Sequence, residues 1–202
     1  VSPEALLVGS QVTIYGVMEG YLNRAVSMVM QQMSGLQTDY YRDFNCDPID
    51  VNTNGRWTAM YGTGGLIDLN TTQNVAEEQE KYVLLAISQM WEALLFSTAA
   101  DLWGAIPYSQ AANPEYAQPK FDSQQDVHMA VLDLIDDAIK NFQKGQTFAL
   151  PVEYDFTFSA DIDRWIAAAR TLKSRIYLNW AEVNSDYYQL ALQESEMGIL
   201  DE

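Results

Sequence analysis

The segment from Val83 to Leu95 constrains the fold most strongly. Apolar residues run along it in two stripes at helical spacing, with Val83, Ile87, Met90 and Leu94 on one side and Leu84, Trp91 and Leu95 on the other. A helix that is apolar on two faces is stable in water only when neighbouring elements cover both faces. The sequence therefore predicts a layered helical fold in which this segment is buried.

Helix signals also dominate the rest of the chain. Four of the predicted helices begin at a side chain that can cap them: Ser2, Asn74, Ser123 and Asp161. Two more are predicted over 57–69 and 185–197. Three segments with polar or proline-bearing patterns are predicted loops, 36–56, 104–119 and 145–160, and the last has room for a short extended stretch.

Helices in consecutive pairs, with little sign of a sheet, predict an all-α fold of the tetratricopeptide-like helical-repeat type. No sequence repeat of about 34 residues is visible, so the predicted stacking is degenerate. We interpret 1–202 as one helical domain. The last predicted helix stops at Gly198 and the sequence ends four residues later, at Glu202, so we expect a C-terminal part outside this chain.

The chain carries a formal net charge of −17, from 28 acidic and 11 basic residues. Such a surface repels phosphate backbones and anionic lipid headgroups, so nucleic acid is not expected as a partner. The charge permits a neutral ligand without selecting one. Solubility is the plainer explanation for it.

Cys46 and His128 are the only cysteine and the only histidine. Their number excludes an internal disulfide and a zinc site built from cysteine and histidine, and no cofactor is expected. The polar residues before Cys46 are unlike a signal peptide, so it is not a lipid-attachment cysteine. With no secretion signal and no uninterrupted apolar run of about 18 residues, the chain is either cytosolic or a trimmed mature form.

Three stretches, in order along the chain, resemble the SusD/RagB family. The most specific is ADLWGAIPYSQA at 100–111, which follows the family's pattern of Asp, an aromatic residue, Gly, two residues and Pro-Tyr. It departs from that pattern in having Trp103 for the usual tyrosine or phenylalanine and Ala105 for a common polar residue. The capped helix of 121–138 and the DRWIAAARTLKSRIY helix of 163–177 are similar to the family's next two motifs, and Trp57 with Tyr61 fits a preceding one.

The resemblance implies a non-catalytic protein on the bacterial outer membrane, held there by an N-terminal lipid that this chain lacks. Such proteins bind a glycan, or in some members a peptide. They cap a SusC-like TonB-dependent transporter and pass the ligand to it. The family's chains are roughly twice this length, and their C-terminal part also contacts ligand.

Aromatic rings suit sugar binding because the C–H face of a pyranose packs on an exposed ring, while amides and guanidinium groups bond its hydroxyls. The predicted loop 36–56 and the residue after it offer such groups, and we interpret these as ligand-contacting residues: Tyr40, Tyr41, Arg42, Asn45 and Trp57. Alternatively, Trp57 and one tyrosine pack into the core. Trp103 and Tyr108 flank a tight Gly-Pro turn, where structural packing is the favoured interpretation.

Other candidate sites are weaker. Residues 50–55 match the first half of a calcium loop, but Tyr61 stands where the bidentate glutamate belongs, so we favour an asparagine-rich turn. A glycosidase needs two carboxylates in one cleft, and the candidates Glu77, Glu78, Asp136 and Asp137 fall on polar helix faces. His128 is predicted at a partly buried surface, with no nucleophile motif nearby. Nothing in the sequence argues for catalysis.

The basic residues of the 161–184 segment gather on one helix: Arg164, Arg170, Lys173 and Arg175. We expect them to pair with acids on neighbouring helices, and contact with the transporter is the other possibility. A rival to ligand binding is also open, in which the domain is a helical scaffold that docks on the transporter and the missing C-terminal part holds the glycan or peptide.

Overall fold

The structure is a computed structural model that describes residues 1–36, 38–45, 50–145 and 150–200. In this part of the chain nine α-helices follow one another: α1 (Pro3–Tyr15), α2 (Asn23–Val29), α3 (Thr38–Phe44), α4 (Asp50–Tyr61), α5 (Leu66–Glu78), α6 (Tyr82–Trp103), α7 (Gln124–Lys144), α8 (Ile162–Trp180) and α9 (Asp186–Ser195). A π-helical segment, η1 (Gly16–Leu22), joins α1 to α2, and a 3₁₀ turn, η3 (Val152–Tyr154), precedes α8. No strand occurs among the described residues, and the all-α prediction is confirmed.

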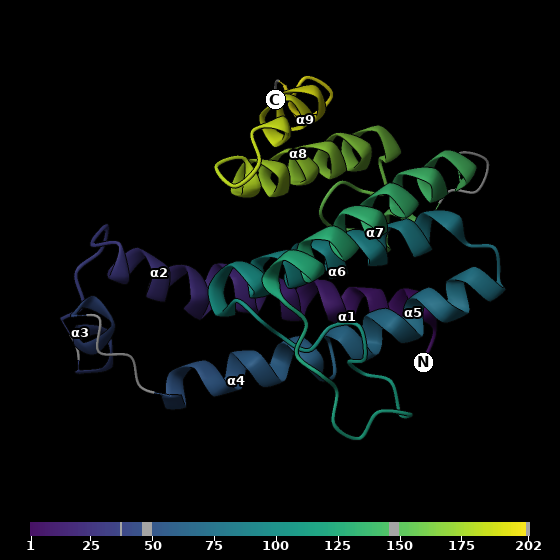
Figure 1. Cartoon of the computed structure of the whole chain (residues 1–202). Helices are drawn as coiled ribbons and strands as arrows, with labels where there is room; N and C mark the ends of the chain where they lie inside the picture. Colours follow the sequence, from purple (N-terminus) through teal and green to yellow (C-terminus); the bar gives the residue numbers. More distant parts are fainter. Residues whose placement is uncertain (37, 46–49, 146–149, 201–202) are drawn as a thin grey trace.

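The helix α6 lies at the centre of the molecule, in contact with α1, α5, α7 and α8 (Figure 1). Ile87, Trp91 and Phe96 are among its many buried side chains, which confirms that both faces are covered. Full burial of one such side chain contributes about 1.5–3 kcal/mol to stability. Among the described residues α6 is also long and apolar enough to cross a membrane, but 89% of that window is buried in the protein, as in a core helix.

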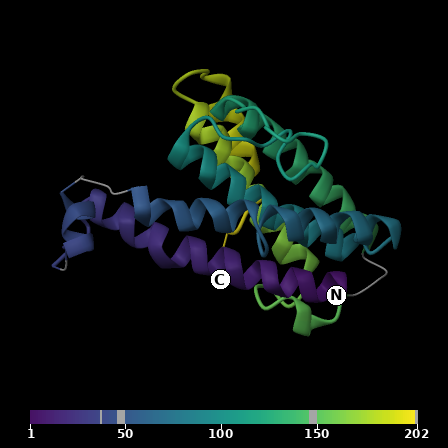
Figure 2. The ribbon, with the colours of Figure 1, turned by 90° about the horizontal axis from the view of Figure 1, so that it is seen from below.

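Consecutive helices pack on one another through the second half of the chain, α5 on α6, α6 on α7, α7 on α8 and α8 on α9. The N-terminal rod of α1, η1 and α2 runs beside α4 and α5 (Figure 2). Within the rod, α1 packs on α5 and α6. This pairwise stacking agrees with the predicted tetratricopeptide-like architecture.

Three of the four predicted caps are confirmed. The Oγ atoms of Ser2 and Ser123 and a carboxylate oxygen of Asp161 each accept a hydrogen bond from the backbone N–H three residues on, at 3.1–3.3 Å. The prediction for Asn74 is wrong, because this residue lies inside α5. The chain reverses later, at 79–81, and α6 begins without a side-chain cap.

The predicted helix over 57–69 is wrong, because a glycine turn at 62–65 separates α4 from α5. Gly64 has a φ of 81°, and a Cβ on it would lie 2.1 Å from Oγ1 of Thr13 in α1. Its N–H donates to Asp68 Oδ2 at 2.7 Å. Only glycine fits the turn, since the rod packs directly against it.

The predicted loop over 36–56 is also wrong, because α3 and the first half of α4 occupy it. Asn54 and Gly55 belong to residue types with low intrinsic helix propensity. Tertiary contacts outweigh that preference, since α3 packs on α2, Met60 is buried and Trp57 packs against the core. The segment 50–55 is therefore part of a helix and not the asparagine-rich turn that we favoured. Cys46 lies outside the described residues.

His128 is fully buried, which corrects its predicted place at the surface. Its Nδ1 accepts a hydrogen bond from Trp180 Nε1–H at 2.8 Å, and its Nε2 lies 3.3 Å from both the Ser97 carbonyl oxygen and the Asp101 carboxylate. Partial burial alone would raise the pKa of Asp101, but hydrogen bonds from His128 and Arg175 lower it below its ordinary value. The imidazole thus ties α7 to α6 and α8.

The basic residues of α8 pair with acids on neighbouring helices, as predicted, with Arg164 as the exception. The contacts, at 2.5–3.3 Å, are Arg170–Glu194, Lys173–Glu194, Lys173–Asp136 and Arg175–Asp101. Lys173 is buried, so these acids balance a charge that would otherwise be costly inside the protein. Arg164 approaches Asp161, the cap of its own helix, at 3.8 Å.

Asp155 organises the turn between η3 and α8, where a short extended stretch was predicted. Its fully buried carboxylate accepts hydrogen bonds from the N–H groups of Thr157 and Ala160 and from Trp165 Nε1, at 2.7–3.0 Å. One side chain thereby satisfies two backbone donors and fixes the indole of Trp165 against Phe142 in the core.

We expect Asp155→Ala to lower the free energy of unfolding by about 2–4 kcal/mol, because it leaves three donors without an acceptor. Urea denaturation followed by circular dichroism measures the loss. Asp133→Ala, at an exposed position on α7, is the matched control and is expected to change stability by less than about 0.5 kcal/mol. Equal stability of the two variants would contradict the role assigned to Asp155.

Candidate functional site

An apolar groove lies where α4 and α5 meet the loop that follows α6. Its volume is about 420 Å³, and the lining residues are Trp57, Thr58, Tyr61, Gly62, Ile67, Pro107, Ala111, Ala112 and Pro119. None of these described lining residues carries a charge. We refer to this feature as the Trp57 groove.

The aromatic side of the groove is built from rings that support one another. Trp57 packs against Tyr61 at a centroid distance of 5.0 Å and meets Trp103 edge-on at 5.6 Å. Tyr61 packs in turn on Phe96 of the buried helix α6 at 5.4 Å. Trp57 itself is half-buried, so its ring is anchored on one side and borders the groove on the other.

The opposite wall is the loop of residues 104–122, which closes on itself. Ile106 and Asp122 exchange two backbone hydrogen bonds at 2.9 and 3.1 Å. The Asp122 carboxylate also accepts from the N–H groups of Tyr108 and Ser109 and from the Ser109 hydroxyl, and it pairs with Lys120. Burial alone would raise the pKa of Asp122, but these partners lower it below its ordinary value.

Two tyrosines attach this wall to the helices. The Tyr61 hydroxyl donates to the Pro107 carbonyl oxygen at 2.7 Å, and the Tyr108 hydroxyl donates to Glu92 Oε1 at 2.8 Å. Burial raises the pKa of both phenols, with a further increase from the neighbouring carboxylates. Burial also raises the pKa of Glu92, against the effect of its two hydrogen-bond donors, Tyr108 and Gln73. The predicted packing role of Tyr108 is confirmed, and Trp103 likewise packs against the core.

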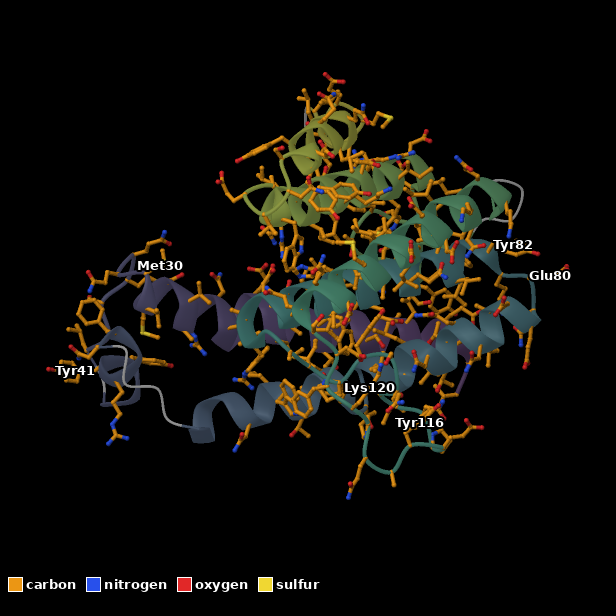
Figure 3. All side chains as sticks on the ribbon, in the orientation of Figure 1. Met30, Tyr41, Glu80, Tyr82, Tyr116 and Lys120 are labelled. Atoms are coloured by element: carbon orange, nitrogen blue, oxygen red, sulfur yellow. The ribbon has the colours of Figure 1, made fainter. Side chains whose placement is uncertain are left out.

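The structure does not bring the five predicted ligand residues together. Four lie on or just after α3, at the tip beyond the far end of α4, and only Trp57 borders the groove. Figure 3 shows Tyr41 at this tip, far from Tyr116 and Lys120 of the loop wall. Sequence reasoning missed Ile67, Pro107 and Pro119, which come from segments distant in the chain.

At the α3 tip the predicted residues differ in how free they are. The Arg24 guanidinium lies over the Tyr40 ring, 5.5 Å from its centroid, and the Asn45 amide donates to the Tyr41 carbonyl oxygen at 2.6 Å. The Tyr41 ring is 60% exposed, and Arg42 is exposed as well. Tyr41 and Arg42 are therefore the two of this group that present side chains to solvent.

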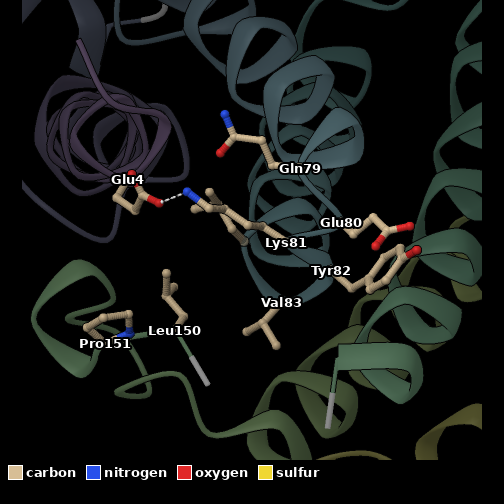
Figure 4. Close-up of a pocket in the computed structure, with 9 residues that line it drawn as sticks. Glu4, Gln79, Glu80, Lys81, Tyr82, Val83, Leu150 and Pro151 are labelled. Atoms are coloured by element: carbon tan, nitrogen blue, oxygen red, sulfur yellow. Dashed lines mark hydrogen bonds and ion pairs between the residues drawn. The ribbon is translucent and has the colours of Figure 1, made fainter. Parts of the chain in front are cut away.

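A second pocket of about 420 Å³ lies where α1 meets the start of α6 (Figure 4). Lys81 spans it and binds Glu4 at 2.5 Å, and this hydrogen bond lowers the pKa of Glu4. Tyr82, Leu150 and Pro151 line the rest. The ion pair of Lys81 and Glu4 sets this pocket apart from the uncharged Trp57 groove.

Among the described residues no group of three or more His, Cys, Asp or Glu side chains is placed to hold a metal ion. Of the glycosidase candidates, Asp136 pairs with Lys173 and Asp137 with Lys140. No described carboxylate lines the Trp57 groove.

A family model described as "Starch-binding associating with outer membrane" matches residues 1–201. The chain belongs to this SusD-like family. The motifs of residues 100–111, 121–138 and 163–177 thus led to the correct family. None of the curated proteins matches the chain.

Solved structures of SusD-like proteins share the fold. A SusD/RagB family protein from Bacteroides thetaiotaomicron has a TM-score of 0.86 at 21% identity and covers all of this chain. A SusD homologue from Bacteroides ovatus (TM-score 0.74, 18% identity, 98% of this chain) and a chitin-binding protein (0.77, 18%, 96%) are also similar. The tetratricopeptide-like architecture is thereby confirmed. This chain spans 41–44% of the length of these three proteins.

We expect Asp122→Asn to destabilise the SusD-like chain by about 1–2 kcal/mol at neutral pH, because an amide replaces an acceptor of several hydrogen bonds. The pKa of Asp122 is lower in the folded state than in the unfolded state. The stabilisation of the fold by its ionised carboxylate is therefore fully present above the unfolded-state pKa of about 3.9 and is lost as the pH falls through the folded-state pKa. The variant should therefore lose less stability than the wild type between pH 5 and pH 3, as measured by urea denaturation at each pH. Parallel pH profiles would contradict this.

Proposed function

We propose that this chain contributes the Trp57 groove as a contact site for an oligosaccharide, in a non-catalytic binding protein of the outer membrane. The observation that carries the proposal is the half-buried ring of Trp57, fixed by Tyr61 and Trp103 at the edge of an uncharged concave surface. A pyranose presents apolar C–H faces that pack on such a ring without strong ionic partners. The lack of charge in the groove favours a neutral ligand in a protein with a net charge of −17.

The α3 tip supplies a second contact in this proposal. Tyr41 and Arg42 offer an exposed ring and a guanidinium group. Asn45, just after the helix, bonds the Tyr41 carbonyl oxygen, and the Tyr40 ring is held by Arg24. The first half of α4 separates this tip from Trp57, and a helix advances about 1.5 Å per residue. Only an extended oligosaccharide could therefore touch both places at once.

The protein would deliver its ligand to a SusC-like TonB-dependent transporter from a lipid-anchored position on the cell surface. The family description, which joins starch binding to the outer membrane, supports this role, and one similar structure is a chitin-binding protein. Neither identifies the glycan for this chain. Because the solved relatives are more than twice as long, the whole protein's ligand and partner are part of the proposal.

A second candidate is a helical scaffold that docks on the transporter, with the glycan or peptide held by the rest of the protein. Exposed apolar side chains on α9 and after it favour this reading: Leu190, Leu192, Met197, Ile199 and Leu200. Exposed apolar side chains mark a contact surface where they are contiguous. The two candidates differ in whether the Trp57 groove touches the ligand.

Trp57→Ala in the full-length protein is expected to weaken oligosaccharide binding by more than about 1 kcal/mol, or at least fivefold in Kd. Calorimetry with maltoheptaose, chitohexaose and a pool of short peptides measures the change. Tyr188→Ala, at an exposed aromatic residue on α9, is the control and should bind as the wild type does. Unchanged glycan affinity in Trp57→Ala, or no glycan binding by the wild type, would favour the scaffold.

Tyr41→Ala tests the second contact by ligand length. We expect the variant to bind maltoheptaose about threefold to tenfold more weakly than the wild type does. Its affinity for maltose should stay unchanged, because only the longer ligand reaches α3. Titration of both sugars against wild type and variant by calorimetry gives the comparison. Equal effects on the two sugars, or none on either, would remove the α3 tip from the site.

A further inference from the structure

Glu92 is a buried carboxylate that does not line the Trp57 groove. It projects from the central helix α6, and only 7% of its surface is accessible. Its hydrogen-bond partners are two neutral donors, Gln73 Nε2 at 2.6 Å from Oε2 and the Tyr108 hydroxyl at 2.8 Å from Oε1. A buried carboxylate without a cationic partner is costly, so its place calls for an explanation beyond packing.

Neither hydrogen-bond partner of Glu92 lines the Trp57 groove, but each belongs to an element that does. Gln73 lies on α5, the helix that also carries Ile67, one of the lining residues. Tyr108 directly follows Pro107, which lines the groove from the loop side. Each carboxylate oxygen therefore holds one of these two elements, and the side chain links α5 to the loop of residues 104–122.

The link reaches the ligand-facing aromatic residues in two further steps. The Pro107 carbonyl oxygen accepts the hydrogen bond of the Tyr61 hydroxyl at 2.7 Å, and the Tyr61 ring packs on Trp57 at 5.0 Å. The Tyr108 ring packs on Phe96 at 5.1 Å, which holds its hydroxyl over α6. A shift of Tyr108 would move Pro107 and with it the partner of Tyr61.

We propose that Glu92 is a positioning residue for ligand binding, which sets the separation of α5 and the loop wall of the groove by accepting one hydrogen bond from each. The proposal rests on the proposed function of the Trp57 groove. It assigns Glu92 no contact with the ligand, and its effect on affinity passes through Tyr108 and Gln73.

The geometry predicts which replacements keep the link. Glutamine at position 92 still accepts from Tyr108 with its oxygen, and its NH₂ group can donate to Gln73 once the Gln73 amide turns over. Leucine has a similar size and offers no acceptor, so both donors lose their partner. Glu92→Gln should therefore preserve the groove, and Glu92→Leu should release its walls.

The first measurement needs no ligand. Hydrogen exchange of the full-length Glu92→Leu variant should show amides of the 106–122 loop exchanging roughly tenfold faster, with those of α8 unchanged. Ile176→Ala, in the core of α8, is a comparably destabilised control that should leave the loop amides protected. Unchanged loop protection in Glu92→Leu would overturn the proposal whether or not any sugar binds.

The second measurement is calorimetric titration with maltoheptaose and chitohexaose. For the sugar that binds the wild type, we expect Glu92→Leu to lose at least about fivefold in affinity, with Glu92→Gln and Ile176→Ala within about twofold. A loss shared equally by Ile176→Ala, or no rescue by glutamine, would overturn the positioning role. If neither sugar binds the wild type although the loop amides respond, the proposed function fails, and the ligand role of Glu92 fails with it.

Discussion

Burial of α6 on all sides fixes where the other helices can lie. Its neighbours α1, α5, α7 and α8 cover an apolar surface that no single partner could hide. The same helix leads into the loop wall at Gly104, whose φ of 72° turns the chain out of the core. It also carries Phe96, against which the aromatic rings of the groove rest. The groove is therefore built directly on the helix that forms the core.

The helices that the sequence predicted well are those whose pattern is local. Apolar residues at helical spacing placed α6, and the capping side chains of α1, α7 and α8 located their first turns. The predictions fail where a contact with a distant part of the chain determines the local secondary structure. The turn at Gly64 is required by Thr13, some fifty residues away in α1, and no pattern within 57–69 contains that information. α3 and α4 are helical because they pack on α2, η1 and α5, despite a composition typical of a loop.

The candidate site also has a part that the sequence suggested and a part that depends on the folded chain. The residue type alone made Trp57 a candidate sugar platform, and the structure places it at the edge of a groove. Tyr40, Tyr41, Arg42 and Asn45 were grouped with it on the premise of one polar loop. A helix between them separates what sequence proximity suggested was one cluster. The loop after α6 supplies the wall opposite Trp57, and Ile67 of α5 lines the groove as well, so the lining residues become neighbours only in the folded chain.

An open and uncharged groove has little with which to select a ligand except its shape. Rigid placement of its walls therefore matters more than it would in a site with strong ionic contacts, because each degree of freedom lost on binding reduces affinity. Here the loop wall is held by two carboxylates in different surroundings. Asp122 closes the loop on itself with charge-assisted hydrogen bonds, and Glu92 joins the loop to α5 from inside the core. The first fixes the conformation of the wall and the second its distance from the facing helix. The proposed binding through ring faces would need both, since stacking weakens quickly when the surfaces separate.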